Sequence, residues 1–293
     1  MRYCLFFLFS FFAIAAKAQQ DSLANKWEPN QKTELGEPVY VYLFNSTRVI
    51  NAHSVEMLDK GTLDVRILHR FDYINKGIKE MFGLDDASMR MGFDYGISNQ
   101  LTIGIGRSTY RKELDGFVKW RITRQTTAPA IQPVSLVLVA GSSVWTQQST
   151  DSPPPSIADR FSHYVQLLIG RRFGKKLSLQ LSPIFVHSNA PFNGEKRNVL
   201  AAGMGMRYKI NHLFSITADY HQALAGMQAI NRSPLSLGLD IETGGHTFQL
   251  HFSNATGMNE RAYIYETYGR FFKADIRFGF NLSRLFTITK RRR

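Results

Sequence analysis

Residues 200–221 read LAAGMGMRYKINHLFSITADYH, and this stretch decides the fold. In its first half every second side chain, from Leu200 to Tyr208, is apolar, and alanine, glycine or a cation stands between them. After a short polar link the pattern returns, with Ser215, Thr217 and Asp219 on the polar face. A period of two is that of a β-strand. The stretch therefore predicts a hairpin whose strands approach the 9 to 11 or so residues that a tilted strand needs to cross a bilayer.

The same alternation recurs from Gly61 to the C-terminal region. Strands are expected to begin at Thr62, Ser88, Leu101, Phe117, Pro133, Ser162, Leu177, Asn198, Leu213, Ser233, His246 and Phe271. The pattern is least regular in residues 134–144, which are apolar on both faces, and in residues 177–186, which Pro183 interrupts. About twelve strands is an even number, as closed bacterial barrels require.

The links between these segments alternate in length. Tight turns fall at residues 97–100, 173–176, 210–212 and 243–245, and a longer one at 124–132. Long polar links lie between them, at residues 72–87, 107–116, 147–161, 187–197, 223–232 and 254–270. Short periplasmic turns and long external loops are typical of outer-membrane barrels. We therefore expect residues 61–289 to form an all-β, antiparallel up-and-down transmembrane barrel with both termini in the periplasm. A soluble secreted β-sandwich, which also alternates, is the alternative fold.

The first residues predict export. Arg2 precedes an apolar run, and Ala16-Lys17-Ala18 then forms a small-x-small cleavage pattern, so residues 1–18 are expected to be a signal peptide. Cys4, the one cysteine, falls within this leader. Residues 19–60 are expected to form a periplasmic arm or plug. Their apolar part, residues 39–50, fits an extra strand or a plug in the lumen equally well. Residues 290–293 form a basic tail.

The composition is basic, with a formal net charge of +13, 44% hydrophobic and 13% aromatic residues. Because the leader exports the chain, nucleic acid is not expected as a partner. Outer-membrane lipids are the expected partners, together with an anionic small solute or a periplasmic protein. The eight histidines are scattered, no Cys-x-x-Cys-His string occurs, and no metal or cofactor is expected.

Several strings resemble one known family. They are Ser46-Thr47-Arg48, Ser54-Val55-Glu56, Gly61-Thr62-Leu63, Arg66-Ile67-Leu68-His69-Arg70-Phe71, Phe82-Gly83-Leu84-Asp85, Met91-Gly92, Tyr95-Gly96, Ile103-Gly104-Ile105-Gly106-Arg107-Ser108, Asp115-Gly116 and Phe278-Gly279-Phe280-Asn281-Leu282-Ser283-Arg284. The chain resembles the outer-membrane β-barrel family, common in Bacteroidota, that is catalogued as a domain of unknown function. The resemblance implies location and fold, and it brings no activity, ligand or catalytic residue.

Charged residues on the predicted inner face are the candidate site. They are Asp64, Arg66, Arg70, Arg90, Asp94, Lys119, Arg121, Arg207, Asp219, His221, Asp240, Glu242, Asp275 and Arg277. Buried charges need partners, and acids and bases are nearly balanced here. We therefore favour a narrow or blocked lumen held by arginine–carboxylate pairs over an open channel. Gly104 and Gly106 are expected to make room for a bulky neighbour or a plug. The function is then a narrow small-solute pore or a scaffold with a filled lumen, and not an enzyme.

The alternative is an outer-membrane lipid hydrolase that uses His251 and Ser253. The string His251-Phe252-Ser253-Asn254 is similar to one in barrel lipid hydrolases, and period two places the histidine and the serine on one face. That face is the predicted lumen, however, whereas the lipid substrate lies outside. A second string, His187-Ser188-Asn189, places its members on opposite faces and is better interpreted as a loop.

Overall fold

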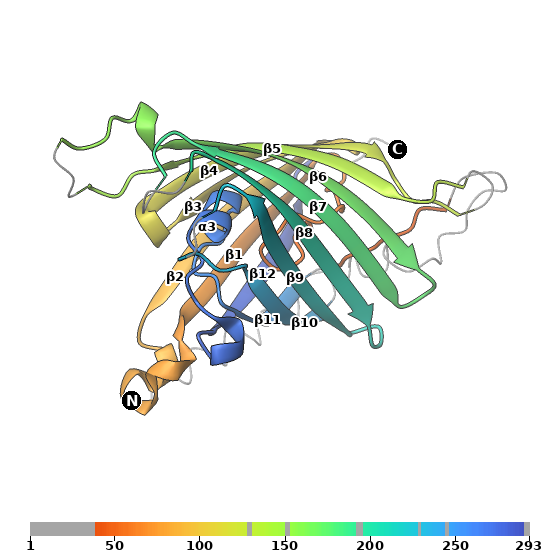
Figure 1. The fold of residues 1–293 in the computed structure, drawn as a ribbon. Helices are drawn as coiled ribbons and strands as arrows, with labels where there is room; N and C mark the ends of the chain where they lie inside the picture. Colours follow the sequence, from red (N-terminus) through yellow and green to blue (C-terminus); the bar gives the residue numbers. More distant parts are fainter. Residues whose placement is uncertain are drawn as a thin grey trace.

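The computed structural model describes residues 39–127, 131–149, 153–191, 196–227, 230–243 and 246–289. The predicted leader, the first part of segment 19–60 and the tail 290–293 lie outside these residues. Within them, twelve antiparallel strands form a closed barrel in which each strand pairs with its neighbours in sequence (Figure 1). Strand β1 (Thr62–Tyr73) pairs with β12 (Arg277–Thr287) from Thr62↔Thr287 to Arg70↔Gly279, and this pairing leaves no open edge.

The remaining strands follow in chain order. They are β2 (Ala87–Ser98), β3 (Leu101–Ser108), β4 (Glu113–Thr123), β5 (Ser135–Trp145), β6 (Phe161–Phe173), β7 (Leu177–Ser188), β8 (Asn198–Lys209), β9 (Phe214–Ala225), β10 (Leu235–Thr243) and β11 (His246–Ser253). The external loops carry the 3-10 turns η1 (Ile74–Lys76), η2 (Ile78–Gly83), η3 (Tyr110–Lys112), η4 (Ala158–Arg160) and η6 (Phe271–Lys273), and the helix α3 (Glu260–Tyr265). The predicted fold class and strand number are confirmed. No helix in the described ranges has the length and apolar character needed to span a bilayer.

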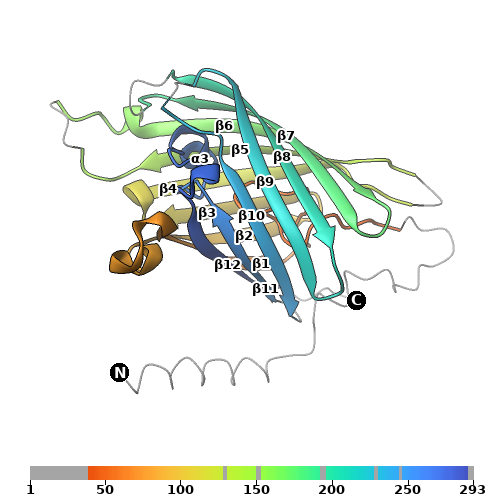
Figure 2. The ribbon, with the colours of Figure 1, turned by 60° about the horizontal axis from the view of Figure 1, so that its bottom comes forward.

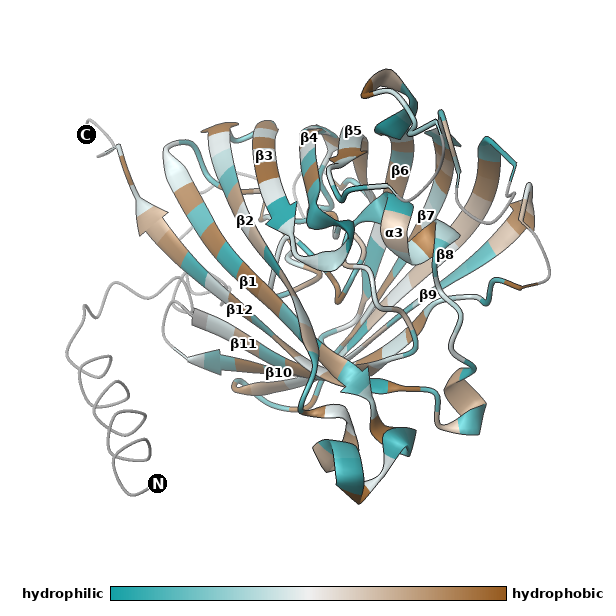
Figure 3. Ribbon diagram, turned by 90° about the vertical axis from the view of Figure 1, so that its left-hand side faces the viewer, coloured by the Kyte–Doolittle hydropathy of each residue, from teal (hydrophilic) through white to brown (hydrophobic). Residues whose placement is uncertain are grey.

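The alternation of side chains is visible along the strands as bands of opposite hydropathy (Figure 3). In β8 the odd-numbered residues from Val199 to Arg207 are buried or nearly so, whereas Leu200, Met204 and Tyr208 are exposed on the outside. Period two thus places one stripe toward lipid and one toward the lumen.

Two strand starts differ from the prediction by more than two residues. The last strand begins at Arg277 rather than Phe271, because Phe271–Lys273 form η6 and Ala274 adopts a left-handed conformation with φ 60°. The Asp275 carboxylate holds this turn by accepting the backbone N–H of Arg270 at 3.0 Å. Strand β4 begins at Glu113 rather than Phe117, since Asp115 pairs with Arg90 inside the barrel and does not form a turn.

The two irregular segments also form strands. In β5 the inward residues Val137 and Val139 are fully buried because an apolar core lies inside the barrel at this point. In β7 the ladder to β6 keeps its register but skips the pairs between Gln166↔Ile184 and Ile169↔Leu181, which is where Pro183 lacks an N–H.

Both ends of the barrel send chain into the lumen. Residues 39–58, which we call the plug, enter and leave at the end with the short turns, because Tyr40 bridges to Thr126 and Gly61 bonds Gly96. Residues 254–270, which we call the inner loop, enter from the opposite end and carry α3 within the ring of strands (Figures 2 and 3). The structure thus places residues 39–50 in the lumen rather than in an extra strand.

Candidate functional site

The tip of the plug sits on a single carboxylate of β9. Asp219 accepts three consecutive backbone N–H groups, from Ile50 at 3.2 Å, Asn51 at 2.6 Å and Ala52 at 3.3 Å. The chain reverses here, since the Val49 N–H donates to the Ala52 carbonyl at 2.9 Å. Successive N–H groups in a turn form a concave anion site. Asp219 is therefore the receptor for the plug tip.

Other polar side chains of the wall bond the backbone of the plug. Gln180 accepts the Val55 N–H and donates to the His53 carbonyl, both at 2.8 Å. Gln249 donates to the Val49 carbonyl at 2.7 Å, and Lys119 donates to the Glu56 carbonyl at 2.6 Å. A segment without regular structure cannot satisfy its own backbone when buried. The wall residues do so here, and this accounts for much of the polar inner face.

Glycines of the wall form sockets for the apolar side chains of the plug. A Cβ at Gly170 would meet the side chain of Leu43 at 2.7 Å and that of Val55 at 2.9 Å. A Cβ at Gly205 would meet Val49 at 3.1 Å. The plug is therefore packed against the wall and not only hydrogen-bonded to it.

Gly104 and Gly106, the two glycines singled out in the sequence, both lie on β3 and also make room for side chains. A Cβ at Gly106 would meet the guanidinium of Arg90, and a Cβ at Gly104 would meet the ring of Phe117 and the carboxylate of Asp94. The prediction that Gly104 and Gly106 make room for bulky neighbours is confirmed.

The inner loop is fixed by a short capped helix. The Asn259 side chain accepts the Ala262 N–H at 2.8 Å and caps α3, in which all six residues are buried. The Tyr265 hydroxyl donates to the Arg197 carbonyl at 2.8 Å, just before β8 begins. Arg70 donates to the carbonyls of Ala255 and Gly257 at 3.0 and 3.1 Å. The wall therefore holds this loop from both sides of the helix.

Plug and inner loop meet at Glu260, and we call this contact the latch. The Glu260 carboxylate lies 3.1 Å from the Arg48 guanidinium and 3.4 Å from the His53 ring. Burial raises the pKa of Glu260, which the charge of Arg48 opposes. Burial and the Arg48 charge lower the pKa of His53, so its imidazole is neutral. A buried ion pair thus joins the periplasmic segment to the external loop.

A second ionic cluster ties the inner loop to the outer rim. Arg261 bonds both carboxylate oxygens of Glu113, at 2.7 and 3.1 Å, and also pairs with Glu266. Glu266 in turn accepts Tyr110 at 2.7 Å and Arg111 at 2.9 Å. Burial would raise the pKa of Glu266, but the charges of Arg261 and Arg111 outweigh it and hold that pKa below its ordinary value. The carboxylate is thus ionised and bound on several sides.

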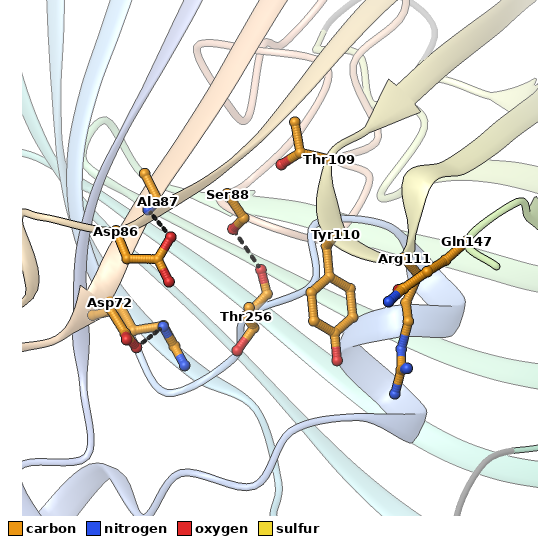
Figure 4. A pocket seen from close by; sticks show the side chains of 10 residues that line it. Asp72, Asp86, Ala87, Ser88, Thr109, Tyr110, Arg111, Gln147 and Thr256 are labelled. Carbon is orange, nitrogen blue, oxygen red and sulfur yellow. Dashed lines mark hydrogen bonds and ion pairs between the residues drawn. The ribbon is translucent and has the colours of Figure 1, made fainter. Parts of the chain in front are cut away.

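Two cavities lie next to these segments. Between the plug and the wall of β1, β11 and β12, a cavity of about 10 Å³ is lined by Arg48, Arg66 and Gln249 among others, which is room for about one water. Above the inner loop, an open cavity of about 500 Å³ faces the external side (Figure 4). We call the larger cavity the outer vestibule. Its lining residues are Asp72, Asp86, Ala87, Ser88, Thr109, Tyr110, Arg111, Gln147, Thr256 and Arg277.

A comparison with family models decides the identity of the domain. The model described as "Membrane bound beta barrel domain (DUF5777)" matches residues 44–286. The chain belongs to this family. The match begins inside the plug, so most of the plug is part of the Membrane bound beta barrel domain. An up-and-down barrel with an even number of strands is the architecture of outer-membrane proteins, and this family member is accordingly an integral outer-membrane barrel. The alternative prediction of a soluble β-sandwich is therefore wrong.

Solved structures share the barrel at low similarity to this Membrane bound beta barrel domain. The NanC porin is 11% identical with a TM-score of 0.47, covering 78% of this chain and 100% of its own. The KdgM porin is 8% identical with a TM-score of 0.44, covering 78% and 99%. Outer membrane phospholipase A from Escherichia coli is 9% identical with a TM-score of 0.42, covering 81% and 96%. These values add nothing to the family assignment. No curated protein sequence matches the chain.

Most of the charged residues that were predicted on the inner face are buried in the lumen of this Membrane bound beta barrel domain. The buried ones are Asp64, Arg66, Arg70, Arg90, Asp94, Lys119, Arg207, Asp219, His221 and Asp240. Arg121 and Glu242 are partly exposed near the short turns, where Arg121 donates to the Asn99 carbonyl and Glu242 lies 3.7 Å from Arg207. Arg66–Asp64 and Arg90–Asp115 are arginine–carboxylate pairs of the kind expected. Asp219, Lys119 and Arg70 instead bond the backbone of the plug or inner loop.

Asp275 and Arg277 were expected in the lumen and lie at the outer rim. Asp275 precedes β12 and accepts the Asn75 amide at 2.7 Å outside the barrel. Arg277 pairs with Asp72 and lies over the Tyr73 ring at 3.7 Å, where it lines the outer vestibule. The reason is the late start of β12, which moves both residues out of the bilayer-spanning part.

The sequence analysis did not identify the charged residues of the plug and the inner loop that lie inside the barrel. Arg48, Glu260, Arg261 and Glu266 come from the plug and the inner loop, and they carry the latch and the rim cluster. The strings Ser46-Thr47-Arg48 and Ser54-Val55-Glu56 were a signal, because charged and polar residues there break an otherwise apolar segment.

His251 and Ser253 lie on the inner face of β11 and are buried. The His251 Nε2 lies 3.2 Å from the Arg70 guanidinium. The Ser253 hydroxyl accepts the Ser236 hydroxyl at 2.8 Å and the Ala255 N–H at 3.2 Å. Each residue thus bonds neighbours of the inner loop or the wall and faces away from lipid.

Proposed function

We propose that the protein is a plugged outer-membrane barrel that is closed at rest and acts as a scaffold with a filled lumen. The observation that carries this proposal is the filling itself. Plug and inner loop bury their side chains against the wall, meet at the latch and leave a cavity of about 10 Å³ between plug and wall. A hydrated solute needs a continuous path, and the plug and the inner loop stand in its way within the described residues.

The polar inner face supports this proposal over a permanent pore. In an aqueous channel the charges of the wall would face water. Here Asp219, Lys119 and Gln180 form hydrogen bonds with the backbone of the plug. These side chains therefore bind the plug and do not line a water-filled channel. The barrel and its filling are complementary at the level of single N–H and carbonyl groups.

A gated small-solute pore is the second candidate. The plug is held by hydrogen bonds, ion pairs and packing, and the latch makes its position depend on the external loop. The plug also buries apolar side chains, among them Leu43, Phe44 and Val55, so its withdrawal needs an applied force. A force on the chain ahead of residue 39, supplied by a periplasmic protein, would withdraw the tip from Asp219.

Conductance in planar bilayers tests the proposal. The purified protein should be silent, and a variant lacking residues 39–58 should give discrete conductance steps. A control variant lacking residues 78–83, which form η2 outside the lumen, should stay silent. Discrete steps from the unaltered protein at low voltage would show an open pore and contradict the resting closure.

We also propose that the barrel is not an enzyme. His251 and Ser253 face the filled lumen, where a phospholipid cannot reach them. Phospholipid hydrolysis by the purified protein should equal that of its Ser253→Ala variant. Hydrolysis that Ser253→Ala abolishes would establish the lipid hydrolase instead.

A further inference from the structure

The turn between β6 and β7 lies at the end of the barrel with the short turns (Figure 1) and is rich in positive charge. Four of the six residues from Arg171 to Lys176 are cations. One of them is committed to the plug, because Arg172 donates to the Tyr42 carbonyl at 3.2 Å. The other three are exposed, and in the part of the chain that the structure describes none of them pairs with a carboxylate. We call Arg171, Lys175 and Lys176 the basic patch.

Aromatic rings of the outward face lie beside two of these cations. The Arg171 guanidinium lies 5.2 Å from the centre of the Phe173 ring, and the Lys176 ammonium lies 6.0 Å from that of Tyr208. The strand register places the two rings in one row, because Leu177 pairs with Phe173 on one side and with Tyr208 on the other. Both rings are nearly half exposed, at 47% and 42%. We call this row of three apolar side chains across β6, β7 and β8 the shelf.

Arg171 belongs by its position to the lipid-facing stripe of β6. It stands two residues deeper in the strand than Phe173, and Ile169 follows it on the same face. Its guanidinium lies over the ring nearer the turn, as the charged end of a long side chain does when it reaches for the membrane surface. The arrangement recurs in β12, where Arg284 lies over Phe286 at 4.9 Å. Aromatic residues gather where strands leave the acyl region, so the basic patch lies at the level of the head groups of the periplasmic leaflet.

We propose that the basic patch binds the head group of an anionic phospholipid, such as phosphatidylglycerol, with the acyl chains against the shelf. The Arg171 guanidinium presents paired N–H donors, whose geometry suits two phosphate oxygens. Lys175 and Lys176 add two ammonium groups, and the Lys209 N–H holds the turn by donating to the Lys176 carbonyl at 2.9 Å. A phosphatidylcholine head group also carries a quaternary ammonium group, which three neighbouring cations repel. The site therefore selects a lipid with a net negative charge.

Native mass spectrometry of the full-length protein in a neutral detergent tests the proposal, because it resolves the lipids bound to each protein molecule. The first phosphatidylglycerol should bind about tenfold more tightly than phosphatidylcholine of the same chain length. Glycerol 3-phosphate in excess should not displace it, since that anion has no acyl chains for the shelf. Equal affinity for the two lipids would overturn the proposal, and so would displacement by glycerol 3-phosphate, which would assign the patch to a soluble phosphate. Neither outcome depends on whether the lumen conducts.

Variants locate the site on the barrel. Arg171→Gln and Lys176→Gln should each weaken the binding of phosphatidylglycerol roughly fivefold and leave that of phosphatidylcholine unchanged. Lys60→Gln is the matched control, because Lys60 is an exposed lysine at the same end of the barrel, next to β1, and this variant should keep the preference of the parent. Heat-modifiable migration in gels checks that each variant is folded. A preference that persists in the folded double variant, with both substitutions, would refute the assignment to the basic patch.

Discussion

At the residue scale, Asp219 attaches the plug by accepting three consecutive backbone N–H groups at its tip. Replacing it with alanine leaves three buried N–H groups without an acceptor, and each costs about 1 to 3 kcal/mol when unsatisfied. We expect Asp219→Ala to release the plug tip at a cost of several kcal/mol, and Asp219→Asn, which keeps one acceptor oxygen, to release it less. Limited trypsin digestion measures this release, because cleavage after Arg48 requires the plug to leave its seat.

Asp240 is the matched control at this scale. It is also a buried carboxylate of the inner face, but it bonds the wall residues Thr217 and Gln249. Asp240→Ala should destabilise the barrel without exposing Arg48. If both variants were cleaved equally fast after Arg48, the plug would not depend on the Asp219 seat.

At the scale of elements, the inner loop is the segment that should respond to pH. The pKa of Glu266 is below its ordinary value in the folded protein, so this carboxylate contributes stability above about pH 4.5. The contribution is lost as the pH falls through the folded pKa. We expect thermal unfolding in detergent to occur at a lower temperature at about pH 3 than at about pH 6.

Glu266→Gln isolates the carboxylate that causes this loss. The variant should be less stable than the parent at about pH 6, and the difference should shrink toward about pH 3. The neighbouring Glu260 opposes the trend, because its raised pKa favours the folded state in acid. A difference between parent and Glu266→Gln that grows in acid would contradict the sign assigned to Glu266.

Elements with a strict period could be predicted from the sequence, and those without one could not. The strands around residues 200–221 appear within two residues of their predicted starts, since lipid on one side and packed side chains on the other leave only one register. The plug has no period, and its partners lie far along the chain, as Asp219 lies 169 residues from Ile50. Helix α3 has six residues, too few for an amphipathic pattern.

At the scale of the whole molecule, the inner face was predictable in its position but not in its partners. Arg70 and Lys119 were expected to pair with carboxylates, yet they bond backbone carbonyls of the inner loop and the plug. A balanced set of inner-face charges is compatible with two arrangements: the charges can pair with each other, or they can bond the backbone of a segment inside the barrel. Only the path of residues 39–58 distinguishes these two arrangements. The outer vestibule is likewise formed in large part by loops, and the sequences of these loops have no periodic pattern from which their contacts could be predicted.

The outer face makes a prediction that concerns the barrel as a whole. Met204 lies in the middle of β8 and is 56% exposed, and in the outer membrane that exposed surface contacts acyl chains. An arginine near the bilayer midplane costs about 2 to 4 kcal/mol and one near the interface about 0 to 1 kcal/mol. Met204→Arg should therefore lower the free energy of unfolding in lipid vesicles much more than Leu213→Arg, which changes an exposed residue in the short β8–β9 turn. Equal effects at the two positions would mean that β8 does not span the bilayer at the depth that its alternation requires. The assignment of the opposite face of the same sheet to the plug would then lose its support.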